Sequence, residues 1–218
     1  MEHALSKLLL LFGLVDYAFG HGMMIEPVGR QSRWRVDDTA PVNTNDNELF
    51  CGGITNTWQV HNGKCGICGD DFGLPTPRPH EFGGEYGSGD IVRVYKAGTD
   101  IPITANLTAN HRGYFTFDIC NMDYSDETEE CFIKLKIEDG SDRFYLPSPE
   151  SGTYHTAVFI PRYIVCDHCV LRWQYTAGNM WGPCGDGTSA LGCGPQEIFR
   201  SCADIRIEDA GHRYFGFL

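Results

Sequence analysis

Short segments in which apolar and polar residues alternate dominate the chain from Ile91 onward, and this pattern constrains the fold more than any other feature. In 114–120 the apolar residues are Phe115, Phe117 and Ile119, a period of two that predicts a strand with one buried face. Similar segments occur at 91–95, 101–109, 131–137, 154–160, 170–176 and 203–207. Turn residues separate them and no long amphipathic helix is visible, so we predict an all-β fold, an antiparallel β-sandwich.

The segment that precedes these strands, residues 21–89, shows little periodicity. It is rich in Pro, Gly, Asn and Asp, and the run PTPRP at 75–79 is too interrupted for a helix or a central strand. We therefore predict long loops here, pinned by Cys51, Cys65 and Cys68.

The first 20 residues resemble a secretory signal peptide. Lys7 provides a positive charge, residues 8–15 are apolar, and residues 18–20 read AFG, a small-x-small cleavage site. Cleavage after Gly20 makes His21 the first residue of a secreted, extracellular protein. A terminal histidine offers two nitrogen ligands, its α-amine and its imidazole. The alternative is cleavage one or two residues away, which leaves His21 an ordinary polar residue.

Removal of the leader leaves 198 of 218 residues, which suits one domain spanning residues 21–218. The net charge changes from −12 to −11, because Lys7, Glu2 and Asp16 are lost. An acidic surface disfavours nucleic-acid binding. The remaining apolar runs fall short of the 18 or so residues that span a bilayer, so we expect no membrane segment. We expect a monomer.

Ten cysteines follow the leader, and an even number in an exported chain predicts five disulfides. The pairs Cys65/Cys68 and Cys166/Cys169 have the C-x-x-C spacing of zinc ligands, so zinc is the alternative. Spacing does not determine the connectivity, because ten cysteines allow on the order of a thousand pairings. The cysteines are Cys51, Cys65, Cys68, Cys120, Cys131, Cys166, Cys169, Cys184, Cys193 and Cys202.

His111 is the candidate partner of His21. It directly precedes the strand predicted at 114–120, a position where a histidine is usually structural or exposed. If the N-terminus packs against this loop, the amine and imidazole of His21 and one nitrogen of His111 converge. Three nitrogens in a plane with open positions suit copper(II) best among the common divalent ions. The amine, with an ordinary pKa near 8, loses its proton to the metal readily.

Six sequence blocks resemble the lytic polysaccharide monooxygenases of auxiliary activity family fifteen, a family formerly grouped with chitin-binding type-4 domains. The resemblance covers nearly all of the chain after the leader. The blocks are His21-Gly22, 45–53, 63–70, 107–111, 169–179 and 193–199.

This resemblance implies an immunoglobulin-like or fibronectin-III-like sandwich with a "histidine brace" that holds one copper ion. The brace consists of the amine and imidazole of His21 and one nitrogen of His111. Phe199 matches the axial position, where it would shield the metal because it has no hydroxyl. Ala109 matches a small residue beside the open face. The co-substrates implied are an external electron donor and O2 or H2O2.

Glu197 lies two residues before Phe199, so both point to the same side if the segment is extended. We interpret Glu197 as an acid near the bound oxidant. The alternative is a surface carboxylate.

The resemblance also implies a crystalline polysaccharide as substrate, oxidised at C1 or C4, with chitin favoured over cellulose. The alternatives are a non-catalytic chitin-binding module, a cellulose-active enzyme of the same family and a secreted copper-binding protein. Trp34 could stack on a sugar ring, although core packing is the more frequent fate of tryptophan. Asn106 begins a glycosylation sequon, N-L-T.

Overall fold

The computed structural model describes residues 21–211. The predicted leader, residues 1–20, and the end of the predicted domain, residues 212–218, lie outside this range. The elements in chain order are β1 (His21–Glu26), η1 (Arg30–Arg35), η2 (Asn56–Val60), β2 (Arg93–Lys96), β3 (Asp100–Ala109), β4 (Tyr114–Asn121), η3 (Glu129–Cys131), β5 (Ile133–Lys134), β6 (Lys136–Ile137), β7 (Phe144–Tyr145), β8 (Gly152–Phe159), β9 (Cys166–Thr176), β10 (Trp181–Pro183), β11 (Ser189–Leu191) and β12 (Ile198–Glu208). Within the described range no helix is long and apolar enough to cross a bilayer.

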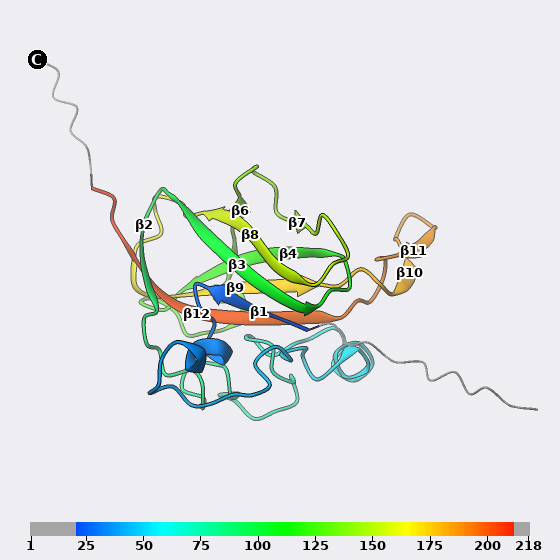
Figure 1. Cartoon of the computed structure of the whole chain (residues 1–218), viewed down its shortest axis with the longest axis horizontal. Helices are drawn as coiled ribbons and strands as arrows, with labels where there is room; N and C mark the ends of the chain where they lie inside the picture. Colours follow the sequence, from blue (N-terminus) through cyan, green and yellow to red (C-terminus); the bar gives the residue numbers. More distant parts are fainter. Residues whose placement is uncertain (1–20, 212–218) are drawn as a thin grey trace, which may run out of the picture.

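Two sheets face each other (Figure 1), which confirms the predicted β-sandwich. One has the strand order β1-β3-β8-β6, and the other has the order β2-β12-β9-β4-β5, with β7 also paired to β4. Neighbouring strands are antiparallel except for the parallel pair β2 and β12. A smaller pair, β10 and β11, forms a separate hairpin.

Apolar side chains from the inner faces of both sheets form the core. Trp173, Tyr175 and Phe115 are almost completely buried there. The rings of Phe115 and Trp173 meet edge to face, 5.1 Å between centroids, a favoured geometry for aromatic pairs. The strand alternation of the sequence is thus explained by one face of each strand pointing into this core.

The outer face of the six-stranded sheet differs from the expected solvent-exposed surface. Thr116 and Asp118 of β4 point outward, yet they are only 7% and 9% exposed. Arg172 of β9 donates a hydrogen bond to Asp118 and another to Glu129. A buried charge needs such partners, and the loops that cover this face supply them.

The segment 131–137 is two short strands in different sheets and not the single strand that its alternation predicts. β5 pairs with β4, whereas β6 pairs with β8. Between them lies Leu135, 1% exposed, whose N–H donates to the carbonyl of Phe117. Burial of this leucine draws the chain from one sheet to the other.

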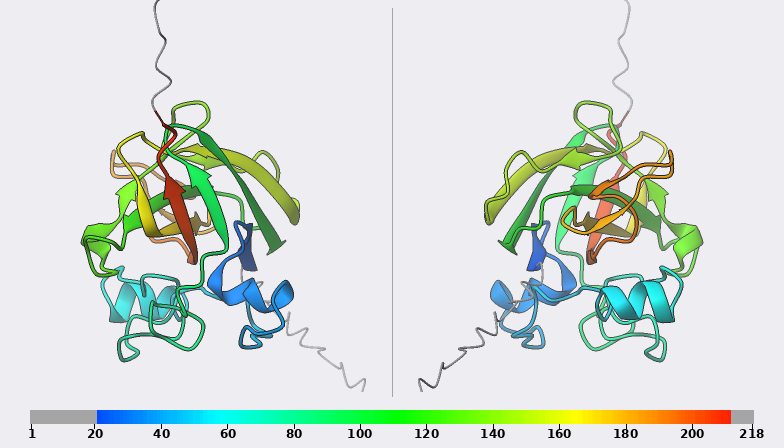
Figure 2. Two further views of the ribbon diagram at one scale, coloured as in Figure 1. Left: turned by 90° about the vertical axis from the view of Figure 1, so that its left-hand side faces the viewer. Right: turned by 90° about the vertical axis from the view of Figure 1, so that its right-hand side faces the viewer.

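The predicted loops between β1 and β2 gather on one side of the sandwich (Figure 2). All ten cysteines form disulfides, so the zinc alternative is wrong. Cys166 and Cys169 pair with each other, but Cys65 and Cys68 do not. The pairs are 51–65, 68–202, 120–131, 166–169 and 184–193. Two of these disulfides hold the loops. Cys51–Cys65 closes the segment that contains η2, and Cys68–Cys202 attaches the loops to β12.

Candidate metal centre

The pairing of β1 with β3 brings the two candidate histidines to one end of the sandwich. His21 lies opposite Ala109, the last residue of β3, and His111 follows two residues later. Gly22 is necessary for this approach, because a Cβ there would lie 2.5 Å from a methyl carbon of the fully buried Leu107. The N–H of Gly22 also donates to the carbonyl of Asn47 at 3.0 Å. The register of two strands therefore positions the N-terminal histidine.

Three contacts hold His111, which is 9% exposed. Its backbone N–H donates to the hydroxyl of Tyr175 at 2.8 Å, and its carbonyl accepts from the N–H of Gly178 at 2.9 Å. Its ring Nδ1 donates to Oε2 of Glu197 at 3.3 Å. Backbone and ring are thus fixed independently, which is how a ligand side chain is held in one orientation.

A tight turn after His111 returns the chain into β4. Arg112 and Gly113 both have positive φ, 60° and 91°. A Cβ at Gly113 would lie 2.0 Å from the carbonyl oxygen of Thr176, so only glycine fits. This turn leaves His111 at the edge of the sandwich.

Each histidine has one ring nitrogen beside a carboxylate. Nε2 of His21 lies 3.4 Å from Oε1 of Glu48, and Nδ1 of His111 faces Glu197. A carboxylate favours an N–H on the nitrogen that it contacts, so the lone pairs lie on Nδ1 of His21 and Nε2 of His111. Nδ1 and the backbone nitrogen of one histidine can chelate a single ion. If the leader is cleaved after Gly20, as the sequence predicts, the donor set would be two imidazoles and an amine, which fits copper(II).

Glu197 is buried against His111, with a side chain 8% exposed, and is not a surface carboxylate. Phe199 is fully buried. Its ring stacks on that of Tyr175, 5.5 Å between centroids, and meets that of Phe50 at 6.3 Å. Ile198 between them is partly exposed, so Glu197 and Phe199 share the inward side, as the extended segment predicts.

The sequence reasoning missed Tyr175, Glu48 and Asn110. Burial raises the pKa of Tyr175 far above its ordinary value, so its hydroxyl stays neutral beside the backbone of His111. Asn110 donates from Nδ2 to the carbonyl of Glu150 and the hydroxyl of Tyr154, both at 2.7 Å. All three residues lie within the resembling blocks, but nothing in their local sequence marks them.

A depression of about 490 Å³ lies beside His21. Its lining comes almost entirely from the end of the segment that connects η1 to η2. The lining residues are His21, Glu48, Phe50, Gly52, Gly53, Ile54, Thr55 and Asn56.

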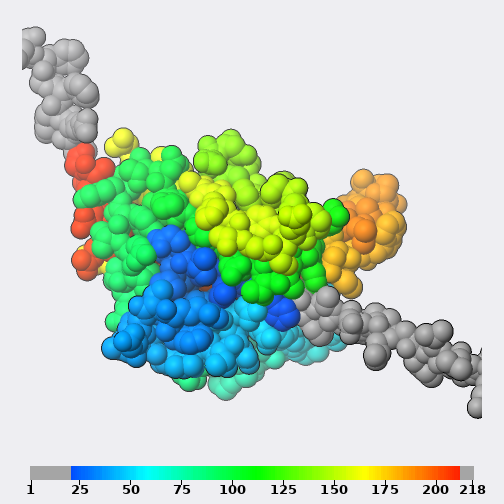
Figure 3. Space-filling view, viewed as in Figure 1, coloured from blue at the N-terminus to red at the C-terminus, as the bar shows by residue number. Residues whose placement is uncertain are grey.

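The hairpin of β10 and β11 projects at the same end of the molecule (Figures 1 and 3). Trp181 and Leu191 face each other across it and are 69% and 64% exposed. The buried amide of Gln196 holds its base through Met180 and Cys193. Trp34, in contrast, is half-buried, and its indole N–H donates to Asp46 at 3.2 Å.

Comparisons with known proteins identify the relatives of this chain. A family model described as "Lytic polysaccharide mono-oxygenase, cellulose-degrading" matches residues 21–205. A lytic polysaccharide monooxygenase AA15 from Thermobia domestica, solved in the Cu(I) state, is 44% identical with a TM-score of 0.83. The match covers 86% of this chain and 99% of that one.

A more distant structure shares the fold. It is an AA10 lytic polysaccharide monooxygenase from Streptomyces lividans, 15% identical with a TM-score of 0.50, and the match covers 85% of this chain and 99% of that one. No curated protein sequence matches the chain.

Proposed function

Because the chain belongs to the lytic polysaccharide monooxygenase family and is a copper-dependent polysaccharide monooxygenase, we propose that His21 and His111 hold its copper ion and that its substrate is chitin. The observation that supports the first part is the register of β1 on β3, in which His21 pairs with Ala109, two residues before His111 in the chain. The 44% identical Thermobia domestica enzyme was solved with copper.

The ligands in this proposal are the amine and Nδ1 of His21 and Nε2 of His111. The amine becomes available when the leader is removed after Gly20. Two findings support that step: the family match begins at His21, and five disulfides suit the oxidising route of a secreted protein.

When bound, copper would supply the redox chemistry: an external donor would provide electrons, and O2 or H2O2 would be the oxidant of the sugar at C1 or C4. The protein contributes rigid and basic ligands. Glu197 orients the ring of His111 and keeps the proton on Nδ1. Its interpretation as an acid near the bound oxidant stays a prediction, because Oε2 of Glu197 faces Nδ1 of His111 and not Nε2, the nitrogen proposed for the metal.

Phe199 excludes water from the inner side of the site. It has no hydroxyl, and its ring is fixed between Tyr175 and Phe50. Ala109, which pairs with His21, keeps the strand end beside the metal small. The substrate would therefore approach the metal from the solvent side, opposite Phe199.

The depression beside His21 favours chitin. A chitin surface projects acetamido groups, each with a methyl, an N–H donor and a carbonyl acceptor. The lining offers the apolar side chain of Ile54 together with the amide of Asn56 and the carboxylate of Glu48. Cellulose projects only hydroxyls into such a space. It is the second candidate because the family model that matches is described as cellulose-degrading.

The exposed Trp181 is a better contact for a sugar ring than the half-buried Trp34. Tryptophan provides a flat apolar surface at low entropic cost. The net charge of −11 in the absence of the leader opposes anionic glycans but does not distinguish chitin from cellulose, since both are neutral. We also propose that the enzyme is a secreted monomer. Asn106, whose neighbours Ala105 and Leu107 point into the core, can carry a glycan on the outer face of β3.

Mass spectrometry of the products released from β-chitin and from cellulose, with copper and a reductant, tests the proposal. We expect oxidised chitin oligosaccharides, with weaker or no action on cellulose. If the only oxidised products are cello-oligosaccharides, the substrate is cellulose and not chitin, but the proposed reaction stands. Tight copper binding without oxidised products from either polymer would favour a copper-binding protein, and binding to chitin without oxidation would favour a non-catalytic module.

A further inference from the structure

A second and larger cavity lies away from the candidate metal centre. It is a groove of about 1280 Å³ between two loop segments, 63–82 and 122–130. Arg200 of β12 lines it on the outer face of the sheet, whereas the preceding residue, Phe199, is buried in the core. The groove and the depression beside His21 share no lining residue. The two cavities are therefore separate.

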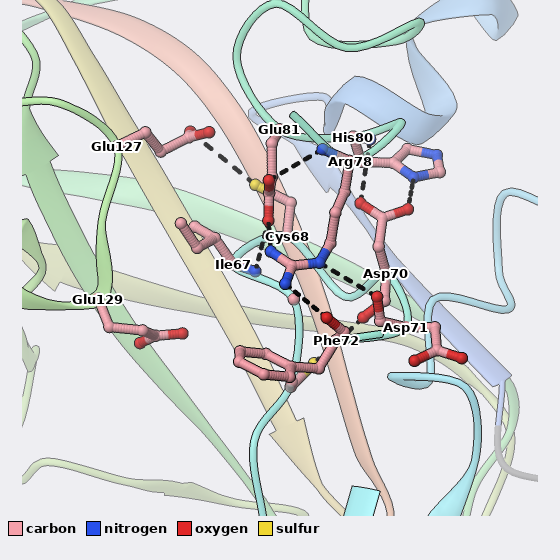
Figure 4. A network of polar contacts seen from close by, with 12 residues as sticks. Ile67, Cys68, Asp70, Asp71, Phe72, Arg78, His80, Glu81, Glu127 and Glu129 are labelled. Carbon is pink, nitrogen blue, oxygen red and sulfur yellow. Dashed lines mark hydrogen bonds and ion pairs between the residues drawn. The ribbon is translucent and has the colours of Figure 1, made fainter. Parts of the chain in front are cut away.

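One wall of the groove carries a buried ion pair (Figure 4). Arg78 donates from Nη1 to Oε1 of Glu81 at 2.6 Å, and both residues are less than one tenth exposed. Its Nη2 donates to the carbonyl of Phe72 at 2.6 Å. Bidentate and multiply bonded guanidinium groups are held rigidly, so this wall presents fixed polar atoms.

The buried charges of the opposite wall are paired in the same way, whereas Asp126 and Glu130, which also line the groove, are exposed. Glu129 accepts from Arg172 at 2.9 Å and also pairs with Arg200. Its side chain is nevertheless 45% exposed, so the carboxylate also faces the groove. Arg78 and Arg200, the two arginines that line the groove, thus each have a carboxylate partner. An anionic ligand would have to compete with these carboxylates for the arginines, whereas a neutral polar ligand can accept from and donate to the pairs without separating them.

Aromatic rings lie among these polar groups. Phe82 is 45% exposed, and its N–H donates to Oε2 of Glu127 at 2.7 Å. The edge of His168 supports its ring at a centroid distance of 5.3 Å. The ring of Phe72, in contrast, has the guanidinium of Arg78 over its face at 4.8 Å, so Phe82 is the ring that a ligand would contact. A flat apolar ring beside oriented donors and acceptors matches a sugar, which has an apolar ring face and a rim of hydroxyls.

We propose that this groove binds a neutral oligosaccharide chain, of the polysaccharide class that the enzyme oxidises, at a site distinct from the metal centre. The sugar class rests on the proposed function. The volume exceeds the roughly 300–1,000 Å³ of a pocket for a drug-sized ligand, so several sugar units fit. When the groove holds one part of a polymer, the effective concentration of the polymer at the metal centre rises. The groove thereby keeps the enzyme on its substrate between reactions.

Calorimetric titration of the copper-loaded protein that begins at His21, with no reductant present, tests the proposal. The probes are the soluble hexamers of N-acetylglucosamine and of glucose, and amide chemical shifts locate the binding. We expect saturable binding with shifts in 63–82 and 122–130, and at least fivefold weaker binding for Phe82→Ala. Phe159→Ala is the matched control, because Phe159 is 40% exposed on β8 and does not line the groove.

His111→Ala separates the groove from the metal centre. We expect this variant to bind the hexamers through the groove as the parent does. Equal affinity of the parent and Phe82→Ala, or shifts confined to 48–56, would overturn the proposal. Binding of the cationic glucosamine hexamer in place of both neutral hexamers would overturn the assignment to a neutral ligand. Oxidised products without groove binding would contradict this inference alone, whereas groove binding without oxidised products would contradict the proposed function alone.

Discussion

The candidate metal centre and the groove are built in opposite ways. At the metal centre, His21 and His111 lie at the ends of paired strands, and each contacts one carboxylate. The groove stands on irregular loops, which disulfides and arginine-carboxylate pairs hold in place. Paired strands fix the positions of side chains precisely, which a site with three nitrogen ligands requires. The loops provide a broad polar surface, on which small displacements matter less.

This difference predicts that damage to the two regions will be separable. Changes at the metal centre should alter copper affinity and spectra with little effect on folding. Changes beneath the groove should alter stability or sugar binding with little effect on copper.

The largest effect is expected from the N-terminus itself. One additional residue before His21 removes the free amine and its chelate ring. Loss of an outer-shell partner already costs about 10- to 100-fold in metal affinity, so we expect more than a 100-fold loss for copper(II). Competition with a chelator and EPR spectroscopy would measure it, and the protein that begins at His21 is the control. Equal affinities and equal spectra would rule out the proposed ligand set.

A buried charge beneath the groove should give the next largest effect. Arg30 is 5% exposed and pairs with Asp204 and Glu127. Replacement by methionine leaves two buried carboxylates without their cation, which typically costs about 3–5 kcal/mol in the free energy of unfolding. Denaturant unfolding would measure this loss. We expect unchanged copper affinity in the folded variant, and a matching loss of copper affinity would show that the two regions are coupled.

The same network predicts a dependence of stability on pH. Despite burial, hydrogen bonds from Arg30 and His168 lower the pKa of Asp204. A lowered pKa in the folded state stabilises the protein above the ordinary pKa of aspartate, and this contribution disappears as the pH falls toward the lowered value. Asp204→Asn should therefore be less stable than the parent at neutral pH. Its free energy of unfolding should also fall less steeply as the pH is lowered. If the free energy of unfolding falls equally steeply with decreasing pH in both proteins, Asp204 is not the cause of the pH dependence.

A smaller effect is expected from Asn110, which holds the turn of His111. Asn110→Asp keeps the shape but loses the donors to Glu150 and Tyr154. We expect about a tenfold loss of copper affinity and a shifted EPR spectrum, with folding preserved. Thr188→Val, on the exposed hairpin, is a control for a surface change. An unchanged spectrum would show that the turn needs no such support.

The smallest effect is expected from Phe199→Tyr. The buried ring is confined by Tyr175 and Phe50, and the substitution leaves both histidines unchanged, so copper affinity should be preserved. If Phe199 lies on the axial side, the new oxygen will shift the EPR spectrum. A spectrum identical to that of the parent would place Phe199 away from the metal.

The sequence alone determined the strand pattern, the formation of disulfides and the two candidate histidines. These depend on information that is local or that a family resemblance carries. Alternation every two residues is visible wherever one face of a strand is buried. His21 was identified from the leader before it, and His111 from the block that resembles the family.

The contacts between residues that are distant in sequence depend on how the chain folds. Cys65 and Cys68 have the same C-x-x-C spacing as Cys166 and Cys169, yet they pair with Cys51 and Cys202 and not with each other. Residues 131–137 alternate as one strand, but burial of Leu135 divides them between two sheets.

The residues that contact the two candidate histidines likewise come from distant parts of the chain. Glu48 and Tyr175 reach the two histidines from segments that are far from His111 along the chain. The exposure of Trp181 and the half-burial of Trp34 likewise follow from what packs against each side chain. Local periodicity reports which face of an element is buried. It contains no information about the partner that buries it, because that partner is set by long-range packing.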